Sequence, residues 1–167
     1  SSYADTVSGG AGADNIYGYG GDNRLTGGAG IDVFTVSIGS SDTITDLAFN
    51  DESDVVVNSG LVTAHLQGNW IATSDTVKYG SHTSFIIDAD SSESVDLSNI
   101  ALVGGAGGYQ VLSSSTGPII GSLYEDYLVL DTSTASFTGG AGDDVFDVLG
   151  TGNGLTITDL GNGADGI

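Results

Sequence analysis

Residues 9–35 read GGAGADNIY, GYGGDNRLT and GGAGIDVFT, which are three consecutive blocks of nine residues. Each block begins with glycine, carries aspartate or asparagine at its sixth position and has a large apolar residue at its eighth. Glycines permit backbone conformations with positive φ, and turns of this kind let carbonyl oxygens converge on a cation. The blocks therefore predict a repeat in which glycine-rich, cation-binding turns alternate with short strands.

The same frame extends beyond these three blocks. Residues 1–8 fit it with Asp5 at the sixth position, and a degenerate block that follows a one-residue insertion holds Asp42. The apolar residues at the eighth positions are expected to point inward and to form a thin core. These residues are Val7, Ile16, Leu25, Phe34 and Ile44.

The pattern G-G-x-G-x-D-x-U-x, in which U is a large apolar residue, resembles the nonapeptide repeat of the RTX (repeats in toxin) family. The resemblance implies a parallel β-roll in which two nonapeptides complete one coil. It also implies that calcium binds between loops on the same edge of the roll. Calcium takes about six to eight oxygen ligands and mixes carboxylates with carbonyls, which suits such loops.

The spacing of the blocks pairs the expected ligands. Asp14 and Asp32 are 18 residues apart and both of their loops are complete, so they form the best predicted site. On the opposite edge, Asn23 stands where an aspartate is expected, which predicts a weaker site completed by carbonyls and by the next coil. The predicted ligands of this first roll are Asp5, Gly10, Gly12, Asp14, Asn23, Gly28, Gly30, Asp32 and Asp42.

The pattern returns near the C-terminus. Residues 139–147 form a complete block, and residues 121–129 fit the frame with fewer glycines. The predicted ligands there are Asp126, Gly140, Gly142 and Asp144. Ala135 and Asn153 stand at the sixth positions of the alternate blocks, so that edge is expected to bind calcium poorly.

Longer segments also recur. Gly27–Phe34 is repeated closely as Gly139–Phe146, and Thr43–Leu47 as Thr156–Leu160. The chain is therefore interpreted as one module followed by the start of a second, with a period of roughly 110–120 residues.

Residues 48–118 lack the nonapeptide but contain strand-like runs, which lie at 54–57, 61–66, 70–73, 76–79, 84–88 and 95–103. We expect an all-β chain in which two parallel β-rolls flank an antiparallel sheet or sandwich cap, with Trp70 in the core of the cap. Asp88 and Asp90 lie in an acidic turn that resembles the cap of secreted RTX proteases; the turn could bind calcium, but its departure from EF-hand spacing favours a solvated turn. The predicted segments are a first roll at 1–47, the cap at 48–103, a linker at 104–118 and a second, shorter roll at 119–167.

Composition narrows the functional classes. The chain has 22 acidic and 2 basic residues, for a net charge of −20, which argues against binding to nucleic acid or to anionic membranes. It has no cysteine and no apolar run of the roughly 18–20 residues that a membrane span needs. Neither His65 nor His82 belongs to an H-E-x-x-H motif, and no G-x-S-x-G motif occurs, so we do not expect an enzyme.

These features favour a calcium-binding structural module of a secreted bacterial surface protein, such as an adhesin, an S-layer-like protein or a filament subunit. It would bind several Ca²⁺ ions, fold on binding them, and contact neighbouring copies or tandem modules. The RTX resemblance implies export by a type I system to an extracellular location. The alternative is the C-terminal calcium-binding tail of a secreted enzyme.

Overall fold

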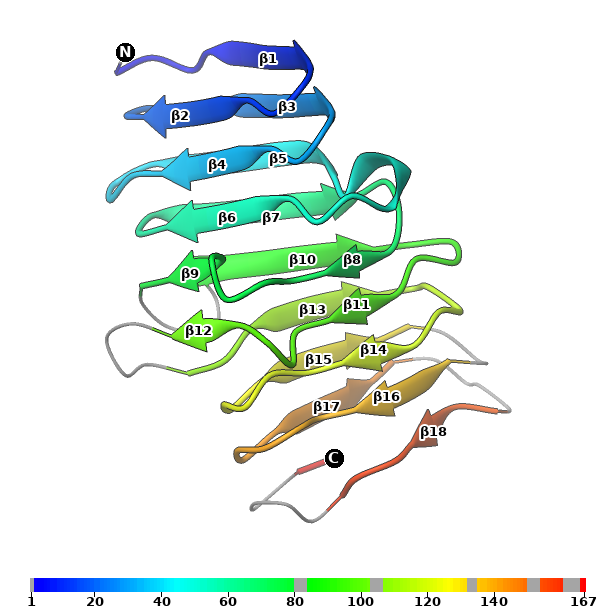
Figure 1. Ribbon diagram of the computed structural model, residues 1–167. Helices are drawn as coiled ribbons and strands as arrows, with labels where there is room; N and C mark the ends of the chain where they lie inside the picture. The colour runs from blue at the N-terminus through cyan, green and yellow to red at the C-terminus, as the bar shows by residue number, and fades with distance from the viewer. Residues whose placement is uncertain (1, 80–83, 103–106, 132–134, 150–153, 161–165) are drawn as a thin grey trace.

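The computed structural model describes residues 2–79, 84–102, 107–131, 135–149, 154–160 and 166–167. Its strands stack coil upon coil from the N-terminus to the C-terminus (Figure 1). All strand pairs within the described residues are parallel, so the fold is a parallel β-solenoid. The 3-10 turn η1 (Phe49–Asp51) interrupts it. No helix in the described part of the chain has the length and hydropathy of a membrane span.

Three sheets form the walls of the solenoid. The long sheet consists of β1 (Thr6–Ala11), β3 (Arg24–Ala29), β5 (Ser41–Leu47), β7 (Leu61–Leu66), β10 (Phe85–Ala89), β13 (Gln110–Ser113), β15 (Tyr127–Leu130) and β17 (Val145–Val148). The second sheet consists of β2 (Asn15–Tyr19), β4 (Val33–Val36), β6 (Val55–Asn58), β9 (Val77–Lys78) and β12 (Ala101–Leu102). The third sheet consists of β8 (Trp70–Ile71), β11 (Val95–Asp96), β14 (Ile119–Ile120), β16 (Ser136–Thr138) and β18 (Thr156–Ile157).

The coils change size along the stack. Thr6 pairs with Arg24, a coil of 18 residues, whereas Ile86 pairs with Gln110, a coil of 24. The wider coils hold three strands instead of two, because β8 and β9 both follow β7, and β11 and β12 both follow β10. The wall opposite the long sheet therefore passes from the second sheet to the third across these coils (Figure 1).

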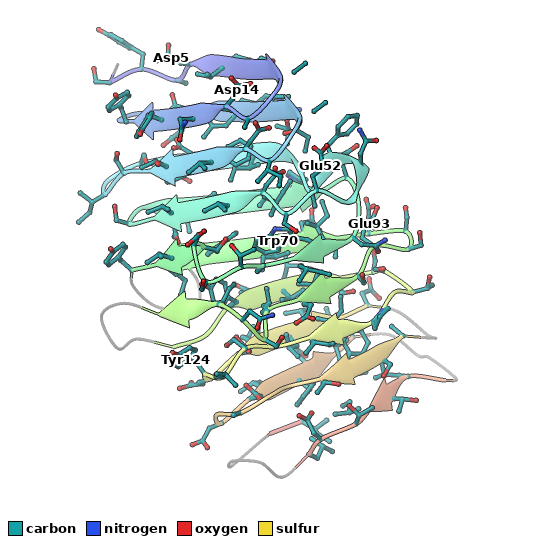
Figure 2. The ribbon with its side chains drawn as sticks, viewed as in Figure 1. Asp5, Asp14, Glu52, Trp70, Glu93 and Tyr124 are labelled. Carbon is teal, nitrogen blue, oxygen red and sulfur yellow. The ribbon has the colours of Figure 1, made fainter. Side chains whose placement is uncertain are left out.

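The core is a column of apolar side chains enclosed by these walls. The predicted inward residues Ile16, Leu25, Phe34 and Ile44 are at most 3% exposed, and Val7 is partly buried against them. In the wider coils the column continues through larger aromatic rings. Trp70 is fully buried, 6.1 Å from the Phe85 ring centre, as its predicted core position requires (Figure 2).

The antiparallel cap predicted at 48–103 is wrong. The strand-like runs there do form strands, but β6, β7 and β10 pair in parallel with strands from the coils before and after them. Alternation of apolar residues is the same for parallel and antiparallel strands, so the pattern predicts strands and not their direction.

The linker predicted at 104–118 also needs correction. It contains β13, which pairs with β10 and β15, and both Val111 in this strand and Tyr109 just before it are buried. Residues 103–106 lie outside the described part of the chain. One continuous sheet thus links the regions predicted as separate rolls.

Candidate metal centre

The sixth-position residues of the first roll form a ladder along one edge of the solenoid. The backbone N–H of Asp14 donates to Oδ1 of Asp32 at 2.9 Å, and the N–H of Asp32 donates to Oδ1 of Asp54 at 2.9 Å. Asp14 and Asp32 immediately precede β2 and β4, whose parallel register places equivalent loops directly above one another. The predicted pairing of Asp14 with Asp32 is thus present as a direct contact.

A second ladder follows the opposite edge. Asp5 N–H donates to Oδ1 of Asn23 at 3.0 Å, and Asn23 N–H donates to Oδ1 of Asp42 at 3.0 Å. Asp126 N–H donates to Oδ1 of Asp144 at 2.8 Å. Asp5, Asn23, Asp126 and Asp144 each immediately precede a strand of the long sheet, so the predicted pair of the second roll shares an edge with Asn23 and not with Asp14.

Figure 2 shows both edges: Asp5 and Tyr124 lie toward one side of the stack, and Glu52 lies toward the other. Asp32 precedes a strand of the second sheet, whereas Asp144 precedes a strand of the long sheet. The loops of the two similar segments, Gly27–Phe34 and Gly139–Phe146, therefore lie on opposite edges.

The glycines of successive loops lie in close contact. A Cβ atom added to Gly28 would overlap the carbonyl oxygen of Gly10, and one added to Gly30 would lie 2.5 Å from the carbonyl oxygen of Gly12. The carbonyl oxygens at the second and fourth positions of one loop therefore face the next loop. In the second roll, a Cβ added to Gly140 would likewise overlap the carbonyl oxygen of Ser122.

Carboxylate oxygens in these loops lack partners. Oδ2 of Asp14, Oδ2 of Asp32 and Oδ2 of Asp42 are buried and accept no hydrogen bond. A Cβ on Gly27 would overlap Oδ2 of Asp32, so only glycine leaves room for it. An unpaired buried carboxylate oxygen is costly, and carboxylate plus carbonyl oxygens are the donors that Ca²⁺ prefers. The residues present therefore fit calcium.

The electrostatics of the loops agree with this fit. Burial raises the pKa of Asp32 above its ordinary value, and the charges of Asp14, Asp46 and Glu52 raise it further. Burial also raises the pKa of Asp42. Among the described residues, no three His, Cys, Asp or Glu side chains are grouped to hold a metal ion. A cation in these loops would accordingly take much of its coordination from backbone carbonyls.

Two acidic residues that were not among the predicted ligands accept hydrogen bonds from the last glycine loop of the first roll. Asp46 accepts hydrogen bonds from Gly27 N–H and Gly28 N–H, both at 2.9 Å, and Glu52 accepts one from Gly30 N–H at 2.6 Å. We call the Asp46 interaction the carboxylate clasp. Thr45 beside it hydrogen-bonds to Thr26 at 2.8 Å.

The same clasp recurs in the second roll, where Asp159 accepts from Gly139 N–H at 2.7 Å and Gly140 N–H at 3.0 Å. Thr158 contacts Thr138 at 2.6 Å. The repeated Thr-Ile-Thr-Asp-Leu segment was the sequence signal for these residues, although it did not reveal that the aspartate binds glycine amides.

The family model of the RTX calcium-binding nonapeptide repeat, in four copies, matches residues 1–34. Residues 1–34 are RTX calcium-binding nonapeptide repeats. The RTX repeats thus contain the loops in which the unpaired oxygens of Asp14 and Asp32 lie. No curated protein and no solved structure matches the chain significantly.

Asp126, outside the matched RTX repeats, differs from the aspartates within them. Its Oδ1 accepts from Tyr109 N–H at 2.5 Å and from the Ser122 hydroxyl at 3.1 Å, and its Oδ2 accepts from Ser122 N–H at 2.5 Å. Both oxygens therefore have partners. Ala135 is buried at its loop position, and Asn153 lies outside the described residues.

Proposed function

We propose that the first roll binds calcium between the loops of Asp14 and Asp32. The observation that carries the proposal is the pair of buried Oδ2 atoms that have no hydrogen-bond partner inside RTX repeats. The carboxylates of Asp14 and Asp32 would hold the ion together with loop carbonyls of the glycines at the second and fourth positions. These glycines are Gly10, Gly12, Gly28 and Gly30.

A second calcium ion would bind at the opposite edge, near Asn23 and Asp42. Oδ2 of Asp42 is buried and accepts no hydrogen bond. The Asn23 side chain donates to Oδ1 of Asp42 at 2.9 Å. Asn23 brings no charge, and Asp5 beside it is exposed, so this site would be weaker than the first.

Calcium would supply part of the folding free energy. The chain carries a net charge of −20, and Asp32 and Asp42 are at most 2% exposed, so an ion-free roll holds uncompensated negative charge. A ligand that binds only the folded state adds about 2.7 kcal/mol of stability when its concentration is 100 times its Kd. The first roll would thus be unstable where calcium is scarce and fold where it is abundant.

We place this module in a secreted bacterial surface protein, an adhesin, an S-layer-like protein or a filament subunit, as a non-enzymatic part exported by a type I system. Calcium-dependent folding and the acidic composition support an extracellular setting. The alternative is the calcium-binding tail of a secreted enzyme, which the resemblance of the acidic turn at Asp88 and Asp90 to the cap of secreted RTX proteases supports.

Assembly with the next module, or with another copy, is the remaining part of the proposal. β1 and β2 stand at the ends of their sheets, and such strand edges can pair with further strands. Light scattering with and without calcium would measure the mass of the particle. A monomer at every calcium concentration would argue against self-assembly.

The double variant Asp14→Asn with Asp32→Asn tests the first site. Calorimetric titration should show fewer bound calcium ions than in the parent chain. Chelation should also reduce the far-UV circular dichroism signal by less than it does in the parent chain. The control is Asp75→Asn with Asp131→Asn, which removes the same charge from exposed positions outside the proposed calcium loops. Equal calcium stoichiometry in the double variant and the parent would refute the proposed ligands.

A further inference from the structure

The single lysine of this acidic chain lies inside the fold. Lys78, in β9, is 1% exposed, and its Nζ donates a hydrogen bond to the carbonyl oxygen of Gly108. The same Nζ lies 4.8 Å from the centre of the Tyr109 ring. Lysine is almost never fully buried unless its charge is compensated, so this location requires an anion nearby.

Asp126 is a buried acid that contacts the same peptide unit as Lys78. Tyr109 N–H donates to Oδ1 of Asp126, and a Cβ on Gly108 would overlap the same oxygen. One face of the Gly108–Tyr109 backbone therefore contacts the carboxylate, while its carbonyl oxygen accepts from the ammonium of Lys78. Burial lowers the pKa of Lys78 to about 8, and the charge of Asp126 opposes that change. Asp126 itself is 1% exposed.

The loop of Asp126 also differs from the glycine loops in its free ligand atoms. Asp14, Asp32 and Asp42 each keep a buried Oδ2 without a partner, which calcium could take. Both oxygens of Asp126 accept hydrogen bonds, and Ser122 contributes its N–H and its hydroxyl to them. Ser122 stands at the second loop position, where complete blocks have glycine.

We propose that Lys78 is a built-in counter-ion that does for Asp126 what calcium does for the loops of the first roll. The ammonium neutralises the buried carboxylate and binds the carbonyl oxygen of Gly108, so the loop at 121–126 needs and binds no calcium. The middle coils are then held together independently of calcium, while the first roll depends on it. The comparison with the first roll rests on the proposed calcium function; the contacts of Lys78 and Asp126 with the Gly108–Tyr109 backbone do not.

Calorimetric calcium titration of the full chain tests the assignment. Asp126→Asn should leave the number of bound calcium ions unchanged, whereas Asp32→Asn, which substitutes the equivalent position of a glycine loop, should lower it by one. A loss of one ion in Asp126→Asn would overturn the proposal. If neither variant changes the stoichiometry, the proposed calcium site of the first roll fails, and the pairing of Lys78 with Asp126 is decided by the next experiment.

That experiment is a double-mutant cycle in chelator, with Lys78→Met, Asp126→Asn and the combined variant. Each single substitution leaves one buried charge uncompensated and should lower Tm strongly, and the combined variant should lower it by less than the sum of the two. Additive losses would refute the pairing.

A measurement on the parent chain needs no variant. Because the sequence has one lysine, mass spectrometry of peptides after amine acylation follows Lys78 separately from the α-amino group. With and without calcium, Lys78 should react at least about tenfold more slowly than in the urea-unfolded chain. Reaction at the unfolded rate after chelation would show that calcium, and not the lysine, holds these coils together.

Discussion

Alanine at Gly28 should destabilise the first roll much more than alanine at Gly10. Both residues hold the second position of complete loops on the same edge, and both have positive φ, +102° and +118°. They differ in their surroundings: a Cβ at Gly10 would have no heavy atom within 4 Å, whereas one at Gly28 would overlap the carbonyl oxygen of Gly10. The comparison therefore separates backbone strain from the close approach of two coils.

The magnitudes follow from these two causes. Backbone strain alone costs about 1–3 kcal/mol and applies to both variants. The overlap at Gly28 involves a backbone oxygen that a rotamer change cannot relieve, which adds about 1–3 kcal/mol. The chain is of a size at which 1 kcal/mol shifts Tm by about 2–4 °C, so Gly28→Ala should melt roughly 2–12 °C below Gly10→Ala.

Thermal unfolding in saturating calcium, followed by far-UV circular dichroism, measures the difference. Gly30→Ala and Gly12→Ala provide an independent pair of the same kind, because a Cβ at Gly30 meets the carbonyl oxygen of Gly12 while a Cβ at Gly12 meets nothing. Equal Tm values within each pair would refute the stacking of the loops, on which the proposed calcium site depends.

Three further predictions concern the clasp, the acids and the core. Asp46→Asn and Asp159→Asn should each cost about 1–3 kcal/mol in urea denaturation, because a glycine N–H then faces an amide NH₂; no cost would contradict the clasp. In calcium-free buffer, the free energy of unfolding should fall as the pH rises from about 4 to about 6. Burial raises the pKa of Asp54 from 3.8 to about 6. In this pH range the folded state therefore keeps a proton that the unfolded state has released. Asp54→Asn should flatten that slope, and an unchanged slope would count against this origin. Phe34→Ala should lower the free energy of unfolding by about 3–5 kcal/mol, because Phe34 is fully buried. The loss should be clearly larger than that of Phe49→Ala, because the Phe49 side chain is 37% exposed. Comparable losses would place Phe34 outside the core.

The carboxylate ladders show how far spacing alone can locate the site. Asp14 and Asp32 are 18 residues apart and are in contact, as the repeat predicts. Asp54 continues the ladder at a spacing of 22 residues, because η1 and its flanking residues lengthen the turn. A ligand search at a fixed period finds the first pair and misses the third member.

The local pattern is sufficient for the parts of this protein that depend on neighbours in the chain. Positive φ at Gly28, burial of Phe34 and the contact between Asp14 and Asp32 all follow from one nonapeptide and its period. Each is a property of a single turn or of adjacent coils, and the coils from Thr6 to Arg24 and from Asn15 to Val33 both span 18 residues.

Only the tertiary structure determines the parallel direction of the middle strands, the edge on which Asp144 lies and the cation beside Asp126. Strand direction depends on the path of the chain between consecutive strands of one sheet. Coils of 18 and 24 residues show the same alternation of apolar and polar residues, so the alternation does not reveal that path. Lys78 and Asp126 belong to different coils and meet at the loop of Gly108, where the register of several strands brings them together. The register between distant strands depends on the lengths of all the turns between them. A pattern within one short segment therefore cannot predict it.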